Sequence, residues 1–139
     1  MKVRFIGNIE ARTDAKGRVF LPAVFRKELQ AAGEDSLVLR KDVFQSCLVL
    51  YPASVWNEQM DVLRSRLNRW NATHQQIFRQ FVSDAEVMSI DANGRILLPR
   101  RYLAMAGITQ SVRFIGMGDT IEIWSSEALQ TPFMDSAEF

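Results

Sequence analysis

The chain has 139 residues, of which 47% are hydrophobic and 24% charged, values typical of a soluble globular domain and not of a disordered chain. No apolar run reaches the roughly 18 residues of a membrane span or resembles a signal peptide, and the single cysteine excludes an internal disulfide, so we expect a cytoplasmic protein. The formal net charge is only +1, but residues 1–30 carry seven basic side chains against three acidic ones, which permits a basic binding surface.

A first structural unit is predicted over residues 5–52. It opens with the extended stretch RFIGNIEA and continues with a turn-like sequence, DAKGRVFLP, over residues 14–22. Pro22 suits the first position of a helix and Gly33 suits its left-handed end, so a helix is expected between them. The alternating sequence that follows, SLVLRKDVFQSCLVLYP, predicts the two strands of a hairpin.

A helical linker is predicted over residues 53–83. Its first helix has an apolar seam at helical spacing, made by Trp56, Met60, Leu63, Leu67 and Trp70. The seam fits packing against the protein's own sheet or, because it contains two tryptophans, contact with another subunit. Thr73 and Gln76 resemble a capping box that opens a second helix, whose apolar side carries Ile77, Phe78, Phe81 and Val82.

The first unit is repeated over residues 84–129. After the extended stretch AEVMSI, the sequence DANGRILLP at residues 91–99 shares six of nine positions with DAKGRVFLP. A helix from Pro99 to Gly107, about one turn shorter than its counterpart, and a hairpin in SVRFIGMGDTIEIW complete the repeat. We therefore expect a single domain of two repeats, residues 1–139, that ends in a flexible acidic tail over residues 130–139.

Residues suited to catalysis are scarce. His74 is the only histidine and lies near the start of a predicted helix, while Cys47 lies in an apolar strand, where it is expected to be a small buried side chain. The stretch GMGD stands in a hairpin and lacks the third glycine of a dinucleotide-binding motif. The sequence gives no case for an enzyme, a metal, a cofactor or a small-molecule substrate.

The duplicated turn is the strongest signal. Asp14 and Asp91 can accept hydrogen bonds from nearby backbone N–H groups, and Gly17 and Gly94 can adopt the positive φ that other residues resist. Each turn also brings an arginine, Arg18 or Arg95, to the start of the next strand. From the residues alone these arginines either lock the turn through an ion pair with the aspartate or contact a ligand, and the two alternatives stay open.

The pattern Asp-x-x-Gly-Arg-[Val/Ile]-x-Leu-Pro followed by a short helix resembles the DNA-binding signature of the AbrB/MazE superfamily, and two copies in one chain resemble the MraZ family. The resemblance extends from Phe5 to Leu129. It implies an α+β, mainly β fold: a pseudo-two-fold, swapped-hairpin β-barrel in which two internal repeats intertwine, with helical segments between and after them.

The same resemblance implies a sequence-specific DNA-binding transcriptional regulator, a repressor that acts without a cofactor on its own operon of division and cell-wall genes. Such proteins form closed homo-oligomeric rings that bind direct repeats in operator DNA, so we expect association with the nucleoid. The residues expected to face double-stranded DNA are Lys16, Arg18, Arg26, Arg95, Arg100 and Arg101.

The two halves differ at positions that matter for this expectation. Leu103 stands where the first half has Arg26, and Asn93 where it has Lys16, so we expect the first half to supply more phosphate contacts. One alternative function is a protein-interaction, antitoxin-like module, supported by the acidic tail with Phe133, Met134 and Phe139. A barrel enzyme is a further alternative, for which no catalytic constellation is present.

Overall fold

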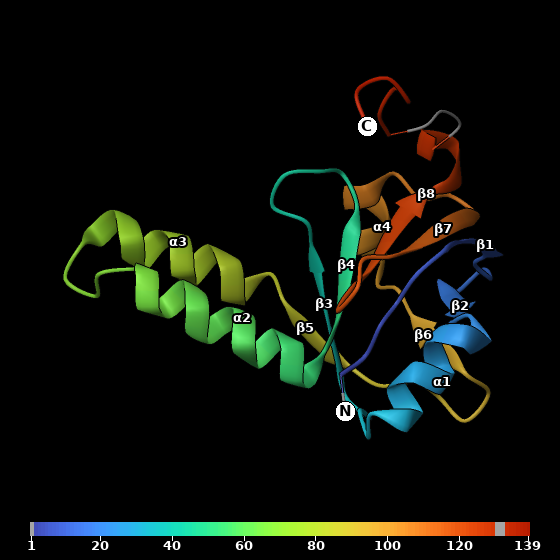
Figure 1. Cartoon of the computed structure of the whole chain (residues 1–139), viewed down its shortest axis with the longest axis horizontal. Helices are drawn as coiled ribbons and strands as arrows, with labels where there is room; N and C mark the ends of the chain where they lie inside the picture. The colour runs from blue at the N-terminus through green and yellow to red at the C-terminus, as the bar shows by residue number, and fades with distance from the viewer. Residues whose placement is uncertain (1, 130–132) are drawn as a thin grey trace.

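The computed structural model describes residues 2–129 and 133–139, which form a mainly β, α+β fold (Figure 1). Within this part of the chain the strands are β1 (Asn8–Arg12), β2 (Arg18–Phe20), β3 (Leu37–Lys41), β4 (Leu48–Pro52), β5 (Glu86–Met88), β6 (Arg95–Leu97), β7 (Ser111–Gly116) and β8 (Ile121–Ser125). The helices are α1 (Ala23–Ala31), α2 (Ala53–Arg66), α3 (Ala72–Ser83) and α4 (Arg100–Ala106), and a 3-10 turn, η1, covers Ser126–Leu129.

Six strands form one antiparallel sheet in the order β1-β7-β8-β4-β3-β5. The hairpins β3–β4 and β7–β8 lie at its centre and are the two predicted from alternating apolar residues. The first strand of each repeat pairs with the hairpin of the other repeat, β1 with β7 and β5 with β3. The strand order therefore reads the same from either edge when the two repeats are exchanged.

The remaining strands, β2 and β6, form a separate two-stranded antiparallel ribbon. They follow the two Asp-x-x-Gly-Arg turns, so the ribbon joins the duplicated motifs directly. An open sheet plus a ribbon is what the described residues form, and no closed barrel is found among them. The closed barrel expected from the family resemblance is not confirmed, because the described strands pair in two separate sheets.

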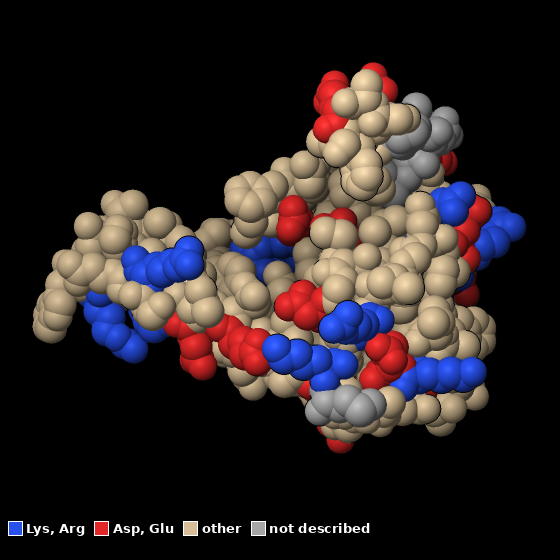
Figure 2. Space-filling model, in the orientation of Figure 1, with Lys and Arg blue, Asp and Glu red and all other residues tan. Residues whose placement is uncertain are grey.

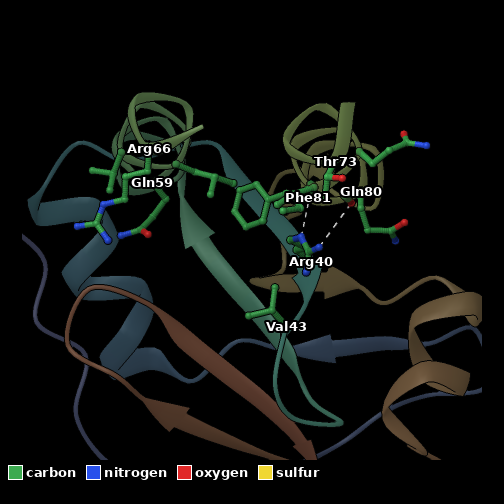
Figure 3. Close-up of a pocket in the computed structure, with 11 residues that line it drawn as sticks. Arg40, Val43, Gln59, Arg66, Thr73, Gln80 and Phe81 are labelled. Atoms are coloured by element: carbon green, nitrogen blue, oxygen red, sulfur yellow. Dashed lines mark hydrogen bonds between the residues drawn. The ribbon is translucent and has the colours of Figure 1, made fainter. Parts of the chain in front are cut away.

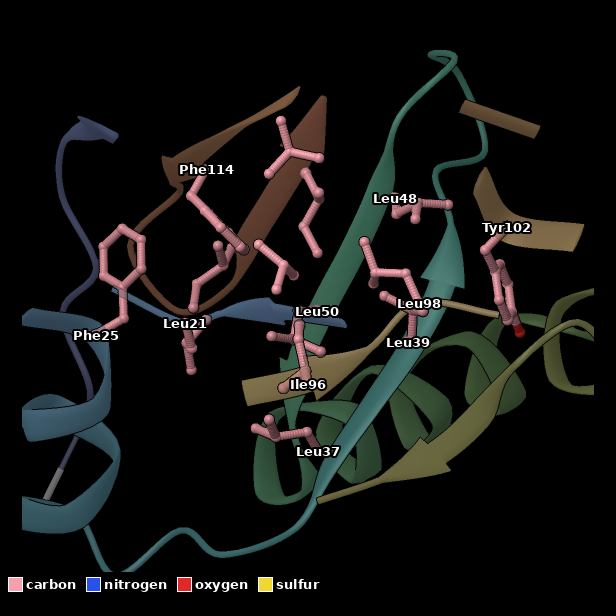
Figure 4. Close-up of a cluster of buried hydrophobic side chains, with 14 of the residues drawn as sticks. Leu21, Phe25, Leu37, Leu39, Leu48, Leu50, Ile96, Leu98, Tyr102 and Phe114 are labelled. Atoms are coloured by element: carbon pink, nitrogen blue, oxygen red, sulfur yellow. The ribbon is translucent and has the colours of Figure 1, made fainter. Parts of the chain in front are cut away.

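One apolar core joins both sheets (Figure 4). Val19 and Ile96 project inward from the ribbon, Leu39 and Leu50 from the β3–β4 hairpin, and Phe114 from β7. Helices α1 and α4 close this core with Phe25 and Tyr102, which occupy equivalent positions after Pro22 and Pro99. The core is therefore built about equally from the two repeats, as a pseudo-two-fold arrangement requires.

The two short helices begin one residue later than predicted. Pro22 and Pro99 are the capping residues, with extended backbone (ψ 139° and 151°), and the helices start at Ala23 and Arg100. Gly107 caps α4 in the left-handed conformation at φ 64°, as expected, and Gly33 follows the end of α1 at φ 70°. The predicted helix positions are right to within the usual uncertainty of helix ends.

Helices α2 and α3 form an antiparallel pair that projects away from the sheet (Figure 1). At its base Trp56 is buried and stacks on Phe81, with ring centroids 4.9 Å apart. Leu67 and Trp70 lie beyond the end of α2, and Trp70 is 96% exposed, so the predicted seam is wrong at its far end. The helix ends there because Leu67 adopts an extended backbone (φ −109°, ψ 141°).

The capping box predicted at Thr73 is also wrong. Asn71 caps α3, and its side-chain oxygen accepts the backbone N–H of His74 at 3.1 Å. Thr73 lies inside the helix instead. Asparagine is a stronger N-cap than threonine, so the local preference favours Asn71.

The C-terminal segment lies beside β8. Phe133 packs edge-on against Trp124, with ring centroids 5.5 Å apart. Part of the predicted tail, residues 130–132, lies outside the described residues. Among the helices described, none combines the length and apolar character needed to cross a membrane.

Candidate nucleic-acid interface

The two Asp-x-x-Gly-Arg turns have the same backbone hydrogen bonds. In the first, the N–H of Asp14 donates to the carbonyl of Arg18 at 2.9 Å, and the N–H of Gly17 donates to the carbonyl of Asp14 at 3.0 Å. The second turn repeats both bonds between Asp91, Gly94 and Arg95, at 2.8 and 3.0 Å. Gly17 and Gly94 have φ angles of 87° and 85°, which explains the glycine in each copy.

One carboxylate oxygen of each aspartate organises the turn backbone. Oδ1 of Asp14 accepts the N–H groups of Lys16 and Arg18, each at 2.9 Å. Oδ1 of Asp91 accepts the equivalent N–H groups of Asn93 and Arg95, at 2.9 and 2.8 Å. These hydrogen bonds favour the ionised form, and the backbone N–H of the arginine is the main reason that the pKa of each aspartate is lowered.

The second carboxylate oxygen orients the arginine. Nε of Arg18 lies 2.7 Å from Oδ2 of Asp14, and Nε of Arg95 lies 2.9 Å from Oδ2 of Asp91. Within residues 2–129 and 133–139, neither Nη1 nor Nη2 of either arginine donates a hydrogen bond. The ion pair therefore locks the turn and leaves the outer edge of each guanidinium available to a ligand, so the two alternatives raised by the sequence are compatible.

The outer face of the ribbon carries both arginines. Arg18 lies opposite Leu97 and Phe20 opposite Arg95, so side-chain alternation puts all four on one face. Phe20 is 58% exposed and Leu97 is 51% exposed. The guanidinium carbon of Arg95 lies 5.9 Å from the centre of the Phe20 ring. The result is a small surface that combines two cations with two apolar side chains.

Phe20 and Leu97 were not predicted as part of this surface. Both stand two residues after the arginine of their motif, in a strand whose middle residue is buried. Alternation within DAKGRVFLP and DANGRILLP therefore contained a signal for two exposed apolar residues.

The other predicted basic residues are dispersed around the turns. Lys16 is exposed at the tip of the first turn, and Arg100 is exposed at the start of α4. Arg101 is held by Glu86, at 3.2 Å between Nη2 and Oε2, and its guanidinium lies over the Tyr102 ring. Arg26 donates from Nε to the carbonyl of Leu21 at 3.0 Å and lies beside the second turn, not its own.

Charge is mixed over the surface around α1 and the ribbon. Figure 2 shows Lys and Arg side chains at the right edge of the molecule, where β1, β2 and α1 lie in Figure 1, with acidic side chains among them. The acidic side chains at the top belong to the C-terminal segment. Any attraction for a polyanion at the ribbon is therefore local, and does not come from the net charge of the chain.

A second surface feature is an apolar groove of about 620 Å³ where α2 and α3 meet the β3–β4 hairpin (Figure 3). Val62 and Ile77 line it and are exposed, and Phe81 lies between the two helices. Arg40, which is buried at the groove floor, donates from Nε to the carbonyl of Phe81 at 2.8 Å and lies under its ring. The groove is a candidate contact surface for another protein chain.

Side chains suited to metal binding are dispersed over the described ranges. These ranges contain no group of three or more His, Cys, Asp or Glu side chains placed to hold a metal ion. Cys47 is fully buried, and burial raises the pKa of its thiol to about 12. His74 accepts the backbone N–H of Asn68 through Nδ1 at 2.8 Å, as a polar residue at a helix start would.

Comparison with known proteins gives a consistent result over nearly the whole chain. A sequence model of the family described as "MraZ protein, putative antitoxin-like" matches twice, at residues 5–80 and 81–138. The transcriptional regulator MraZ of Phocaeicola vulgatus is 66% identical over 137 residues, which cover 99% of this chain and 89% of that protein. The proteins of the same name from Bacteroides thetaiotaomicron and Christiangramia forsetii are 63% and 32% identical, over 99% and 98% of this chain and 88% and 87% of their own lengths.

Proposed function

Since this chain belongs to the MraZ family of transcriptional regulators, we propose that it binds double-stranded DNA through its two Asp-x-x-Gly-Arg turns. The proposed target is a set of direct repeats in the promoter of its own operon of division and cell-wall genes, which it represses in the cytoplasm at the nucleoid. The observation that carries this proposal is the pair of arginines, each oriented by an aspartate through Nε, on one exposed ribbon face.

The geometry suits recognition of phosphates and guanine edges. A guanidinium whose Nε is held by a carboxylate still has two parallel N–H donors at its outer edge, the arrangement that binds guanine O6 and N7 or a phosphate in a bidentate manner. A good pair of this kind discriminates against the wrong base by about 1–3 kcal/mol. Phe20 and Leu97, beside the arginines, can pack against sugars or a thymine methyl group.

The pairing of strands between the two repeats supports a swapped-hairpin arrangement. Because β1 pairs with β7 and β5 with β3, each repeat gives a strand to the other, and β2 pairs with β6 between them. The two turns are thus related by a pseudo-two-fold axis within one chain.

A closed ring of identical chains is the proposed assembly. Two turns per chain give modest affinity, whereas a ring that offers several pairs to spaced repeats gains affinity through effective concentration without a new type of contact. The apolar groove beside α2 and α3 and the exposed Trp70 at the tip of this helical pair supply surfaces for contact between chains. Light scattering of the wild type and of Ile77→Glu tests this: a lower mass for the variant is expected, and an unchanged mass would exclude the groove as the contact.

The DNA-binding proposal is tested with the duplex found just upstream of the protein's own reading frame. Binding of the wild type, Arg18→Gln and Arg95→Gln is measured by fluorescence anisotropy at 50 and 200 mM salt, in competition with a scrambled duplex. Each variant is expected to bind about 5- to 150-fold more weakly, since each loses a pair worth about 1–3 kcal/mol.

The control is Arg69→Gln, which removes the same charge from the exposed turn between α2 and α3. It should bind operator DNA as the wild type does. Binding that survives in the Arg18→Gln, Arg95→Gln double variant would disprove the proposal.

A protein-interaction, antitoxin-like module is the second candidate function. The observation that favours it is the acidic C-terminal segment, in which Phe133 and Met134 are more than half exposed and Phe139 is fully exposed. Truncation after Leu129 should then abolish co-purification with a basic partner and leave DNA binding intact. Unchanged co-purification would exclude this segment as the contact.

A further inference from the structure

Each turn glycine is covered by a side chain from the opposite repeat. A Cβ added to Gly94 in the second turn would lie 2.3 Å from Nη1 of Arg26, which belongs to α1 in the first repeat. A Cβ added to Gly17 in the first turn would lie 3.4 Å from Cδ1 of Leu103, which belongs to α4 in the second repeat. Arg26 and Leu103 occupy equivalent positions, four residues after Pro22 and Pro99.

Backbone hydrogen bonds hold this crossed arrangement in place. The N–H of Leu21 donates to the carbonyl of Gly94 at 3.0 Å, and the N–H of Leu98 donates to the carbonyl of Gly17 at 2.9 Å. The carbonyl of the same Leu21 accepts Nε of Arg26 at 3.0 Å. One residue of the first repeat, Leu21, therefore ties the Arg26 guanidinium to the second turn.

When each turn is counted together with the side chain that covers its glycine, the two turns have the same charge. We define the first turn unit as Asp14, Lys16, Arg18 and Leu103, and the second turn unit as Asp91, Asn93, Arg95 and Arg26. Each unit contains two cations and one carboxylate. The lysine that the second turn lacks is replaced by an arginine from the other repeat, so the sequence difference between the halves is compensated by the fold.

We propose that Arg26 binds a DNA phosphate as part of the second turn unit, so that one chain presents two DNA-contacting units of equal charge, each built from both repeats. The inference rests on the proposed DNA-binding function and deepens it. It replaces the expectation from sequence that the first half supplies more phosphate contacts.

A phosphate suits Arg26 better than a base edge. Its Nε is already bonded to Leu21, and Nη1 lies against Gly94, so the side chain cannot present two free parallel donors. It lines a cavity of about 290 Å³ whose acidic residues are Asp91, the carboxylate of the second turn unit, and Glu34 and Asp35. Arg26 stands in the first turn of α1, at the opposite end of this helix from Glu34 and Asp35. Lys16, a flexible point charge, plays the corresponding part in the first unit.

The first experiment measures salt dependence. Arg26→Leu should weaken binding to the operator and to the scrambled duplex by the same factor, because a phosphate contact carries no sequence information. Each lost phosphate contact reduces the log–log salt slope by about 0.9, so the affinity ratio of wild type to variant should fall about threefold between 50 and 200 mM salt for each bound chain. Lys27→Gln, on the same helix, is the matched control and should leave the slope unchanged.

The second experiment is a pair of double-mutant cycles for operator binding. Arg26→Leu should be non-additive with Arg95→Gln, its partner in the second turn unit, and additive with Arg18→Gln. Asn93→Lys added to Arg26→Leu should restore the salt slope, because it returns the cation to the same turn unit. Arg26→Lys, which keeps the charge and loses the bond to Leu21, separates loss of the cation from loss of folding, and thermal melts of all variants check the fold.

The outcomes separate the two proposals. If Arg18→Gln and Arg95→Gln leave binding unchanged, the DNA-binding function itself fails. If they weaken binding but Arg26 couples to Arg18 instead of Arg95, or if Asn93→Lys restores nothing, the composite unit is overturned and the function stands.

Discussion

Alanine substitutions at Gly17, Gly94 and Gly33 test the steric contacts that surround the two turns. Gly17, Gly94 and Gly33 have similar φ angles of 87°, 85° and 70°, but their neighbours differ. A Cβ on Gly33 would meet nothing within 4 Å. On Gly94 it would meet the flexible end of Arg26 at 2.3 Å, and on Gly17 the backbone oxygen of Leu98 at 2.6 Å. Substitution by alanine therefore adds the same backbone strain to three different steric environments.

The expected losses in the free energy of unfolding follow from these neighbours. Gly33→Ala should cost about 1–2 kcal/mol, which is the left-handed strain alone. Gly94→Ala should cost about 2–3 kcal/mol, because Arg26 must also leave its hydrogen bond to Leu21. Gly17→Ala should cost about 3–5 kcal/mol, because the Leu98 carbonyl belongs to the backbone beside the core and cannot rotate away.

Urea unfolding followed by tryptophan fluorescence, at one fixed protein concentration, measures all three. The ranking is the decisive result, since strain and unfolded-state effects are shared by the variants. Equal losses for the three variants, or a smaller loss for Gly17→Ala than for Gly33→Ala, would refute the steric reasoning about the ribbon.

Three further predictions concern the rest of the molecule. Ile96→Ala should cost about 2–5 kcal/mol and the neighbouring Leu97→Ala less than about 1 kcal/mol, because Ile96 faces the core and Leu97 faces solvent, and the same urea assay measures both. Asp14 and Asp91 have folded pKa values below the ordinary 3.8, so their contribution to stability is complete above pH 3.8 and is lost as the pH falls through the lower folded values; carboxyl NMR titration would contradict this with a pKa at or above 3.8. Cys47, with a pKa of about 12, should react with a thiol reagent at pH 8 only after unfolding in urea, and rapid reaction of the native protein would show that the site is open.

Much of the local structure follows directly from short stretches of sequence. The Asp-x-x-Gly-Arg turns, the proline before each short helix and the alternating hairpins all depend on contacts between residues a few positions apart. At the start of α3 the capping-box pattern of Thr73 and Gln76 predicted the wrong cap, because asparagine, here Asn71, is a stronger N-cap than threonine. The apolar seam was also predicted wrongly at Leu67 and Trp70, because helical spacing does not show where a helix ends.

The candidate site likewise combines contacts that the local sequence predicts with contacts that depend on the tertiary structure. The Asp–Arg pairs were predictable as local contacts, because carboxylate and guanidinium are four residues apart in each turn. The joint face formed by Arg18, Phe20, Arg95 and Leu97 required knowing that β2 pairs with β6. The ion pair of Arg101 with Glu86 joins residues 15 positions apart and was likewise not predictable locally.

By itself, then, the sequence determined that there are two repeats, where their turns and helices lie and which arginine each turn presents, because backbone preferences act within a few residues. Only the tertiary structure decided that β1 crosses to β7, that β5 crosses to β3 and that Arg26 covers Gly94 of the other repeat. Two repeats with the same order of strands, turn and helix can pair strands within themselves or with each other using the same local signals. Burial of one shared core, to which both ribbon strands and both short helices contribute, selects the crossed pairing and sets the charge of each turn.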